Sequence, residues 1–204
     1  MPTSASLTSS TSSAPLLDSD FLAAKFDAGL SYEDYLATGK AAQREAWSAI
    51  YDQVALSDSQ RKLLGDFKRD MKVICVSGIW CGDCVQQGPL LQHIAQGCDR
   101  ISLVWLDRDA HKDLSTRVQI NQGLRVPTVI FLAEDDEFVG LYGDRTLTRY
   151  RALADSQLGP SCPIPGAPVP TDELLATMQD WLDEFERIQL LLRLSPRLRQ
   201  KHGD

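Results

Sequence analysis

The stretch VICVSGIWCGDCVQQGP, from Val73 to Pro89, limits the possible folds of this chain more than any other. It opens with the apolar run VICV, which is too short for a helix and rich in β-formers, so it predicts a buried strand. A Ser-Gly pair ends that strand, and Cys81 and Cys84 then lead into the helix-compatible segment Val85 to Gln96. Two cysteines at this spacing, between a strand and a helix, indicate a dithiol site.

The predicted helix gives the two cysteines different surroundings. Its first turn carries free backbone N–H groups and the positive end of the helix dipole, and both stabilise a thiolate at Cys81. Cys84 lies one turn inside the helix and can close a disulfide with Cys81 without any refolding. We therefore expect the thiolate at Cys81.

The rest of the chain shows helical and strand patterns. Apolar residues at three- and four-residue steps, with a capping pattern at Ser31 and Asp34, predict helices. These are expected at residues 20–29, 31–38, 41–56, 59–71, 112–122, 146–157 and 171–194, the last capped by Thr171. Further strands are expected at residues 101–106, 129–133 and 138–142. Because one short acidic turn joins the last two strands, they should pair antiparallel.

Composition excludes several classes of protein. The chain has 204 residues with 43% apolar residues and 24% charged residues, as in a soluble globular protein. Its net charge of −7 argues against a nucleic-acid partner and against attraction to a membrane surface. There is no run of eighteen apolar residues for a membrane span and no secretory signal at the N-terminus. An odd number of cysteines, five, favours free thiols plus one redox pair, so we expect a cytoplasmic protein.

Four features together give the chain a resemblance to the thioredoxin-fold, or thioredoxin-like, family. They are Trp80 directly before Cys81-Gly82-Asp83-Cys84, Pro89 five residues after Cys84, the cis-proline-like Val126-Pro127-Thr128, and Gly143 sixteen residues after Pro127. The similarity covers about residues 70–154. It implies an α/β fold with a central mixed sheet flanked by helices. The N-terminal helices and the long C-terminal helix predicted from the apolar spacing lie outside a minimal thioredoxin and extend this fold.

The resemblance, together with the composition and the helical patterns outside it, divides the chain into five parts. They are a disordered Ser/Thr-rich tail at 1–17, an N-terminal helical extension at 18–70, a thioredoxin-like core at 71–158, a Pro-rich loop at 159–170, and a C-terminal helix with a basic tail at 171–204.

The activity that the resemblance implies is that of a thiol–disulfide oxidoreductase, a protein disulfide reductase. Cys81 would attack a protein or small-molecule disulfide and form a mixed disulfide, which Cys84 would resolve. No Gly-x-Gly-x-x-Gly or Walker pattern occurs, so no cofactor is expected and electrons would come from a separate reductase or a small thiol. A structural zinc site would need four ligands, and no second Cys-x-x-Cys or paired His accompanies the first, so no metal is expected either.

The family pattern also implies substrate-binding residues. A cis bond at Pro127 would hold its loop against the dithiol, and Val126 would offer its backbone N–H and C=O to an extended substrate. Gly143 would face the dithiol. Trp80 would be a flat apolar wall beside the sulfurs, with a core aromatic as the alternative.

Two residues depart from the family pattern, and both lie near the dithiol. Cys75 stands where thioredoxins bury an aspartate that helps to move the proton of the resolving thiol. Asp83 stands in place of the family's proline. Asp83 and its neighbour Gly82 would modulate the site. We expect the Asp83 carboxylate to oppose the Cys81 thiolate and so to make the pair more reducing. Asp83 is also a candidate proton acceptor for Cys84.

Alternatives remain for the function and for the other cysteines. The alternative function is that of a thioredoxin-fold protein-binding module in which the dithiol is secondary or regulatory. A peroxidase is disfavoured, because the threonine and arginine that surround a peroxidatic cysteine are not visible near Cys81. Cys75 is expected to be a buried inert thiol, and Cys98 and Cys162 are expected to be spectators, Cys162 being open to glutathionylation.

Overall fold

Four strands form one mixed sheet in the computed structural model, which describes residues 17–158 and 170–204. The strands are β1 (Met71–Ser77), β2 (Ile101–Asp107), β3 (Thr128–Ala133) and β4 (Phe138–Gly143), in the order β2-β1-β3-β4. β1 runs parallel to β2, and β3 runs antiparallel to both β1 and β4. The antiparallel β3–β4 pair predicted from the acidic turn is confirmed.

The two central strands are the most buried. All six residues of β3 and six of the seven residues of β1 are buried, as expected for strands covered on both faces. β2 and β4 form the edges and are partly exposed. The helix α5 (Gly82–Gln96) connects β1 to its parallel neighbour β2, so the dithiol lies at the end of a central strand.

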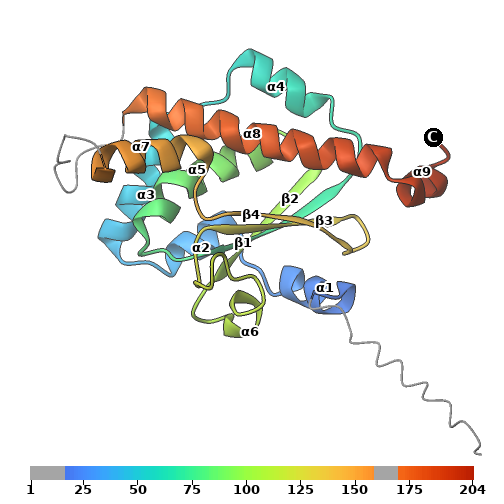
Figure 1. Ribbon diagram of the computed structural model, residues 1–204, viewed down its shortest axis with the longest axis horizontal. Coiled ribbons are helices and arrows are strands. Elements are labelled where there is room, and N and C mark those ends of the chain that lie inside the picture. The colour runs from blue at the N-terminus through green and yellow to red at the C-terminus, as the bar shows by residue number, and fades with distance from the viewer. Residues whose placement is uncertain (1–16, 159–169) are drawn as a thin grey trace, which may run out of the picture.

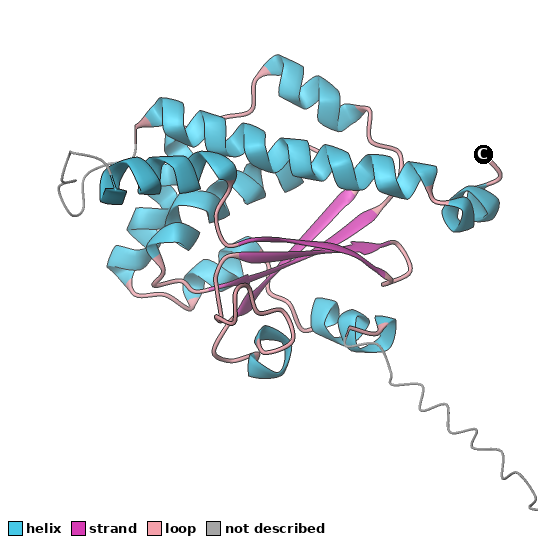
Figure 2. Cartoon of the chain, in the orientation of Figure 1, coloured by secondary structure: helices cyan, strands magenta, loops and turns pink. Residues whose placement is uncertain are grey.

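Helices lie on both sides of this sheet (Figures 1 and 2). Besides α5 they are α1 (Ser19–Asp27), α2 (Tyr32–Ala37), α3 (Ala41–Gln53), α4 (Asp58–Gly65), α6 (Lys112–Ser115), α7 (Leu147–Leu158), α8 (Thr171–Leu194) and α9 (Pro196–His202). In Figure 1, α5 and α8 lie above the sheet while α1 and α6 lie below it. None of the described helices combines the length and hydropathy needed to cross a bilayer.

An aromatic cluster joins the N-terminal helices to the sheet. Its members are Tyr32 and Tyr35 of α2, Trp47 of α3 and Trp105 of β2, and the neighbouring ring centroids lie 5.5–6.0 Å apart. The indole of Trp47 also packs directly on Gly88 of α5, where no side chain would fit. The N-terminal helices are thus part of the same hydrophobic core as the dithiol helix.

The long helix α8 packs against β3 and β4. Phe185 of α8 meets Phe131 of β3 edge-on at 5.1 Å, and Trp181 meets Tyr142 of β4 at the same distance. The apolar residues spaced at three and four positions along this helix form its buried face, except Leu175, which is exposed.

Several predicted element ends are wrong. The helix expected at 59–71 is α4, which ends at Gly65, because Met71 pairs with Ile101 as the first residue of β1. The helix expected at 112–122 is the single turn α6, and Asn121 has a φ of 49° that a helix does not allow. Thr171 does not cap α8 but is its first residue.

The basic C-terminus also differs from its prediction. The sequence predicts a basic tail after the last helix, but this segment forms a separate short helix, α9, which Ser195 caps by accepting a hydrogen bond from the Leu198 amide. The predicted tail at 1–17 and Pro-rich loop at 159–170 lie almost wholly outside the described residues, as does Cys162. The division of the chain into five parts stays a prediction.

Candidate active site

Cys81 and Cys84 lie at the junction between β1 and α5. Cys81 is the N-cap of α5, with extended backbone angles (φ −85°, ψ 124°), and the helix begins at Gly82. Cys81 is partly exposed, whereas Cys84 is fully buried one turn further on. Both thiols are free, so the structure represents the reduced dithiol.

The surroundings of Cys81 favour its thiolate. A hydrogen bond from the Cys84 side chain is the largest cause that lowers its pKa, and the backbone amides of Cys84 and Asp83 add to this effect. Partial burial opposes them, and so, to a smaller extent, does the charge of Asp83. Together they lower the pKa of Cys81 to about 6, so most of this thiol is ionised at neutral pH.

Cys84 has the opposite character. Burial is the largest cause that raises the pKa of this thiol, and the nearby Cys81 sulfur raises it further. The backbone N–H of Gly78 donates to the Cys84 sulfur at 3.5 Å. Cys75 in β1 is also fully buried, and burial raises its pKa too, so it stays protonated as expected of an inert thiol.

A loop distant in sequence closes over the dithiol. The peptide bond between Val126 and Pro127 is cis, and the carbonyl oxygen of Val126 accepts a hydrogen bond from the Cys81 thiol at 3.8 Å. Gly143 pairs with Thr128 beside this loop, and a Cβ at position 143 would collide with the Pro127 carbonyl. The structure therefore brings Val126, Pro127 and Gly143 together with Cys81.

Trp80 stands at the rim of an open depression of about 170 Å³ beside Cys81. Its side chain is 49% exposed, so the alternative of a core aromatic is wrong. The guanidinium of Arg108 lies 4.6 Å from the Trp80 ring centroid and holds the indole from one side. Other residues lining the depression are Asp83, Leu124, Arg125, Val126, Asp144 and Arg145.

Asp83 is not the isolated charge that its sequence position suggested. Arg145 donates to both of its carboxylate oxygens, from Nε at 2.9 Å and from Nη2 at 2.5 Å. Arg149 lies 3.9 Å away, and Asp144 pairs with the same Arg145 at 3.1 Å. The expected opposition of Asp83 to the Cys81 thiolate is present but is the smallest of the causes that act on the pKa of Cys81, and Arg145 pairs with the same carboxylate.

Arg108 and Arg145 were not among the predicted site residues. The only sequence signal for Arg145 is its place two residues after Gly143, and Arg108 lies just beyond the end of β2. Among residues 17–158 and 170–204, no group of three or more His, Cys, Asp and Glu side chains is arranged to hold a metal ion.

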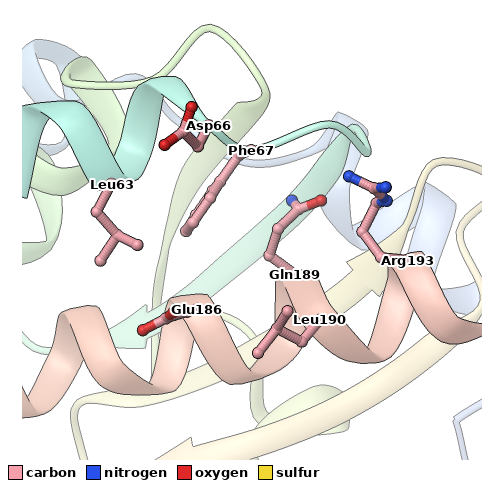
Figure 3. A pocket seen from close by; sticks show the side chains of 7 residues that line it. All are labelled: Leu63, Asp66, Phe67, Glu186, Gln189, Leu190 and Arg193. Atoms are coloured by element: carbon pink, nitrogen blue, oxygen red, sulfur yellow. The ribbon is translucent and has the colours of Figure 1, made fainter.

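A second depression lies between α4 and α8, away from the dithiol (Figure 3). Leu63, Phe67 and Leu190 form its apolar floor, and Asp66, Glu186 and Arg193 stand around it. It contains no cysteine and contributes nothing to the dithiol site.

Comparisons with known proteins identify the family and the fold. A family model described as thioredoxin matches residues 29–155, which include α2, α3 and α4 as well as the sheet. The match thus begins well before residue 70, where the resemblance in the sequence was first visible. No curated protein matches the chain.

Two solved structures share the fold. One is a protein of unknown function from Pseudomonas aeruginosa, with a TM-score of 0.62 and 21% identity, covering 79% of this chain and 94% of that one. The other is an HIV epitope-scaffold, with a TM-score of 0.56 and 19% identity, covering 82% of this chain and 92% of that one. At these identities the two structures support the fold alone. The family model spans more than half of the residues of this chain, so the chain belongs to the thioredoxin family.

Proposed function

We propose that this protein is a thiol–disulfide oxidoreductase that reduces disulfides through its Cys81/Cys84 dithiol. The observation that carries the proposal is the contrast between the two thiols. Cys81, partly exposed at a helix N-cap, has its pKa lowered to about 6, whereas the pKa of the buried Cys84 is raised well above its usual value. One thiol is thus ready to attack at neutral pH while the other is held back.

The reaction follows from this contrast. The Cys81 thiolate attacks one sulfur of a substrate disulfide, the substrate S–S bond breaks, and half of the substrate leaves as a thiolate. Cys84 then loses its proton and attacks Cys81, which releases the second half and leaves a Cys81–Cys84 disulfide. Two electrons pass to the substrate. A separate reductase or a small thiol would return them, because no cofactor pattern occurs in the sequence.

Substrate binding is assigned to the residues around Cys81. The exposed Trp80 offers an apolar surface, and the backbone at Val126 and Pro127 lies against the Cys81 sulfur. An extended segment of a protein or small-molecule disulfide would lie along this loop, which Gly143 allows to pack closely against β4. We place the activity in the cytoplasm, where a dithiol of this kind stays reduced.

A disulfide reduction assay tests the proposal. The native protein should accelerate the reduction of insulin by dithiothreitol, and Cys81→Ser should abolish the acceleration. Cys98→Ser is the matched control, because Cys98 is a buried cysteine at the far end of α5 and outside the dithiol site. If Cys81→Ser behaves like the native protein, the oxidoreductase proposal is wrong, and the binding-module alternative takes its place.

A further inference from the structure

Helix α2 of the N-terminal region places Tyr35 near the buried thiol of Cys84. Tyr35 is fully buried, stacks on Trp105 with ring centroids 5.5 Å apart, and meets Trp47 edge-on at 5.7 Å. Trp47 in turn donates from Nε1 to the Ile79 carbonyl at 3.1 Å, directly before the active-site Trp80. The aromatic cluster therefore fixes both Tyr35 and the chain that leads into the dithiol.

Two buried hydroxyl groups close to Cys84 have no partner. Ser77 is the last residue of β1, fully buried, and directly precedes Gly78, whose amide donates to the Cys84 sulfur. Neither the Ser77 Oγ nor the Tyr35 Oη makes a hydrogen bond of normal geometry in the reduced dithiol. Burying an unpaired hydroxyl costs free energy, so each such group calls for a physical reason.

The resolving step creates the need for such groups. Cys84 must ionise while it is buried, and the titratable neighbours that influence it are the thiols of Cys81 and Cys75, which offer no positive charge. Tyr35 in turn is influenced by Cys84, Cys75 and Asp107 at the end of β2. The Ser77 hydroxyl lies close enough to Cys84 and Tyr35 to lower the pKa of each against the effect of burial, although it makes a hydrogen bond of normal geometry to neither in the reduced dithiol.

We propose that Tyr35 and Ser77 form a hydrogen-bond chain that stabilises the Cys84 thiolate during resolution. The Tyr35 hydroxyl donates to the Ser77 Oγ, and the Ser77 hydroxyl donates to the Cys84 sulfur. Ser77 touches the reacting atom and is a catalytic residue, whereas Tyr35 acts through Ser77 and is a positioning residue. The inference rests on the proposed function and gives the N-terminal helices a part in the chemistry.

The step balances without any further reagent. The proton of Cys84 passes to water, and its sulfur forms a bond to the Cys81 sulfur. The bond between Cys81 and the substrate sulfur breaks, and the substrate leaves with the electron pair as a thiolate. Both hydroxyl groups keep their protons throughout, so they stabilise charge and are not consumed.

Rapid mixing with an aromatic disulfide that releases a coloured thiolate separates the two steps. The full-length protein in a Cys162→Ser background is mixed with this probe. The first release of colour reports attack by Cys81, and the second reports resolution by Cys84. Recording both rates against pH shows whether a variant changes the ionisation of Cys84 or only its position.

Ser77→Ala should slow the second release by about tenfold or more and move its pH midpoint upward, because the charged Cys84 thiolate loses the hydrogen bond that Ser77 donates to it. Tyr35→Phe should slow it by roughly threefold, since it acts through Ser77. Ser77→Thr, which keeps the hydroxyl, should restore the rate. The first release should be unchanged in Tyr35→Phe, because Tyr35 acts only through Ser77.

Tyr32→Phe is the matched control. Tyr32 lies on the same helix and in the same aromatic cluster, and its buried hydroxyl also lacks a partner, but no cysteine influences it. If Tyr35→Phe and Ser77→Ala both resolve as fast as Tyr32→Phe, the hydrogen-bond chain is wrong while the proposed function stands. If Ser77→Ala does not fold, Tyr35→Phe alone decides in the same way. Loss of the first release from the native protein would instead overturn the proposed function itself.

Discussion

At the scale of single residues, two thiols of the same chemical type differ because of where one helix begins. Cys81 occupies the N-cap of α5, where amides of the first turn point at its sulfur, and Cys84 lies inside the helix with no exposed surface. The amides and the neighbouring thiol stabilise charge on Cys81, whereas burial opposes it on Cys84. In the proposed reaction, the order of attack and resolution follows from these two positions.

The reactivity of Cys81 should therefore titrate well below that of an ordinary thiol. The rate of alkylation by iodoacetamide should rise through a midpoint near pH 6 and become flat by neutral pH, since the thiolate is the nucleophile. In urea, the same thiol should titrate at about 8.5. Mass spectrometry of the Cys81 peptide gives the rates, and the buried Cys75 serves as an unreactive reference. A folded-state midpoint near the urea value would contradict the assigned environment.

Arg145 should help to keep this midpoint low. It pairs with both oxygens of Asp83, so in Arg145→Gln the carboxylate beside Cys81 keeps only the more distant Arg149. Alkylation of Cys81 near pH 6 should slow by roughly two- to fivefold. The double variant Asp83→Asn/Arg145→Gln should recover the native rate, because both charges are then gone. A double variant as slow as Arg145→Gln would mean that Arg145 acts directly on the sulfur.

At the scale of elements, the close contact between α3 and α5 limits the side chains of the dithiol helix. A Cβ at Gly88 would collide with the ring of Trp47, which is itself fully buried. Gly88→Ala should thus lower the free energy of unfolding by about 1–3 kcal/mol, measured by urea denaturation. Gly65→Ala is the matched control at the end of α4, where nothing lies within 4 Å, and it should change stability little. Equal midpoints for the two variants would show that Trp47 moves aside freely.

Elements with a strong local pattern could be predicted from the sequence, and elements that depend on distant partners could not. The apolar stripe of α8 and the acidic turn between β3 and β4 each lie within one short segment, so their periodicity was sufficient. The end of α4 was not predictable in this way. The amides of Lys68 and Arg69, which a continuing helix would bond internally, are instead taken by the side chain of Gln189.

The same distinction applies to the candidate site. The dithiol and its helix are contiguous in sequence, and the proline loop carries a family pattern, so both could be named in advance. Arg145 is 62 residues from Asp83, and its pairing arises only from the packing of the chain after β4. Ser77 and Tyr35 carry no pattern at all, because their importance comes from burial beside Cys84 rather than from spacing.

At the scale of the whole molecule, two buried glutamines connect α8 to the rest of the fold. Gln87 of α5 donates to the Asp144 carbonyl at 2.9 Å and accepts from Trp181 of α8 at 3.2 Å. Gln189 of α8 accepts from the Lys68 and Arg69 amides and donates to the Arg69 carbonyl at 3.0 Å. The C-terminal helix is therefore fixed both to the dithiol helix and to the segment that leads into β1.

Gln189→Met should show how much of the global stability depends on the second connection. Methionine fills a similar volume but leaves two backbone amides and one carbonyl unpaired, so the free energy of unfolding should fall by about 2–4 kcal/mol. Gln179→Met is the matched control, since Gln179 lies on the same helix with only exposed hydrogen bonds, to Gln60 and Asp183. Urea denaturation of both variants should show an unchanged slope and a lower midpoint for Gln189→Met alone.

The same two variants also test whether α8 influences the dithiol. Because Gln189 contacts the segment before β1 rather than the sulfurs, the pH midpoint for alkylation of Cys81 should stay the same in both variants. A shift of that midpoint in Gln189→Met would mean that α8 sets the position of the dithiol as well as the stability of the fold.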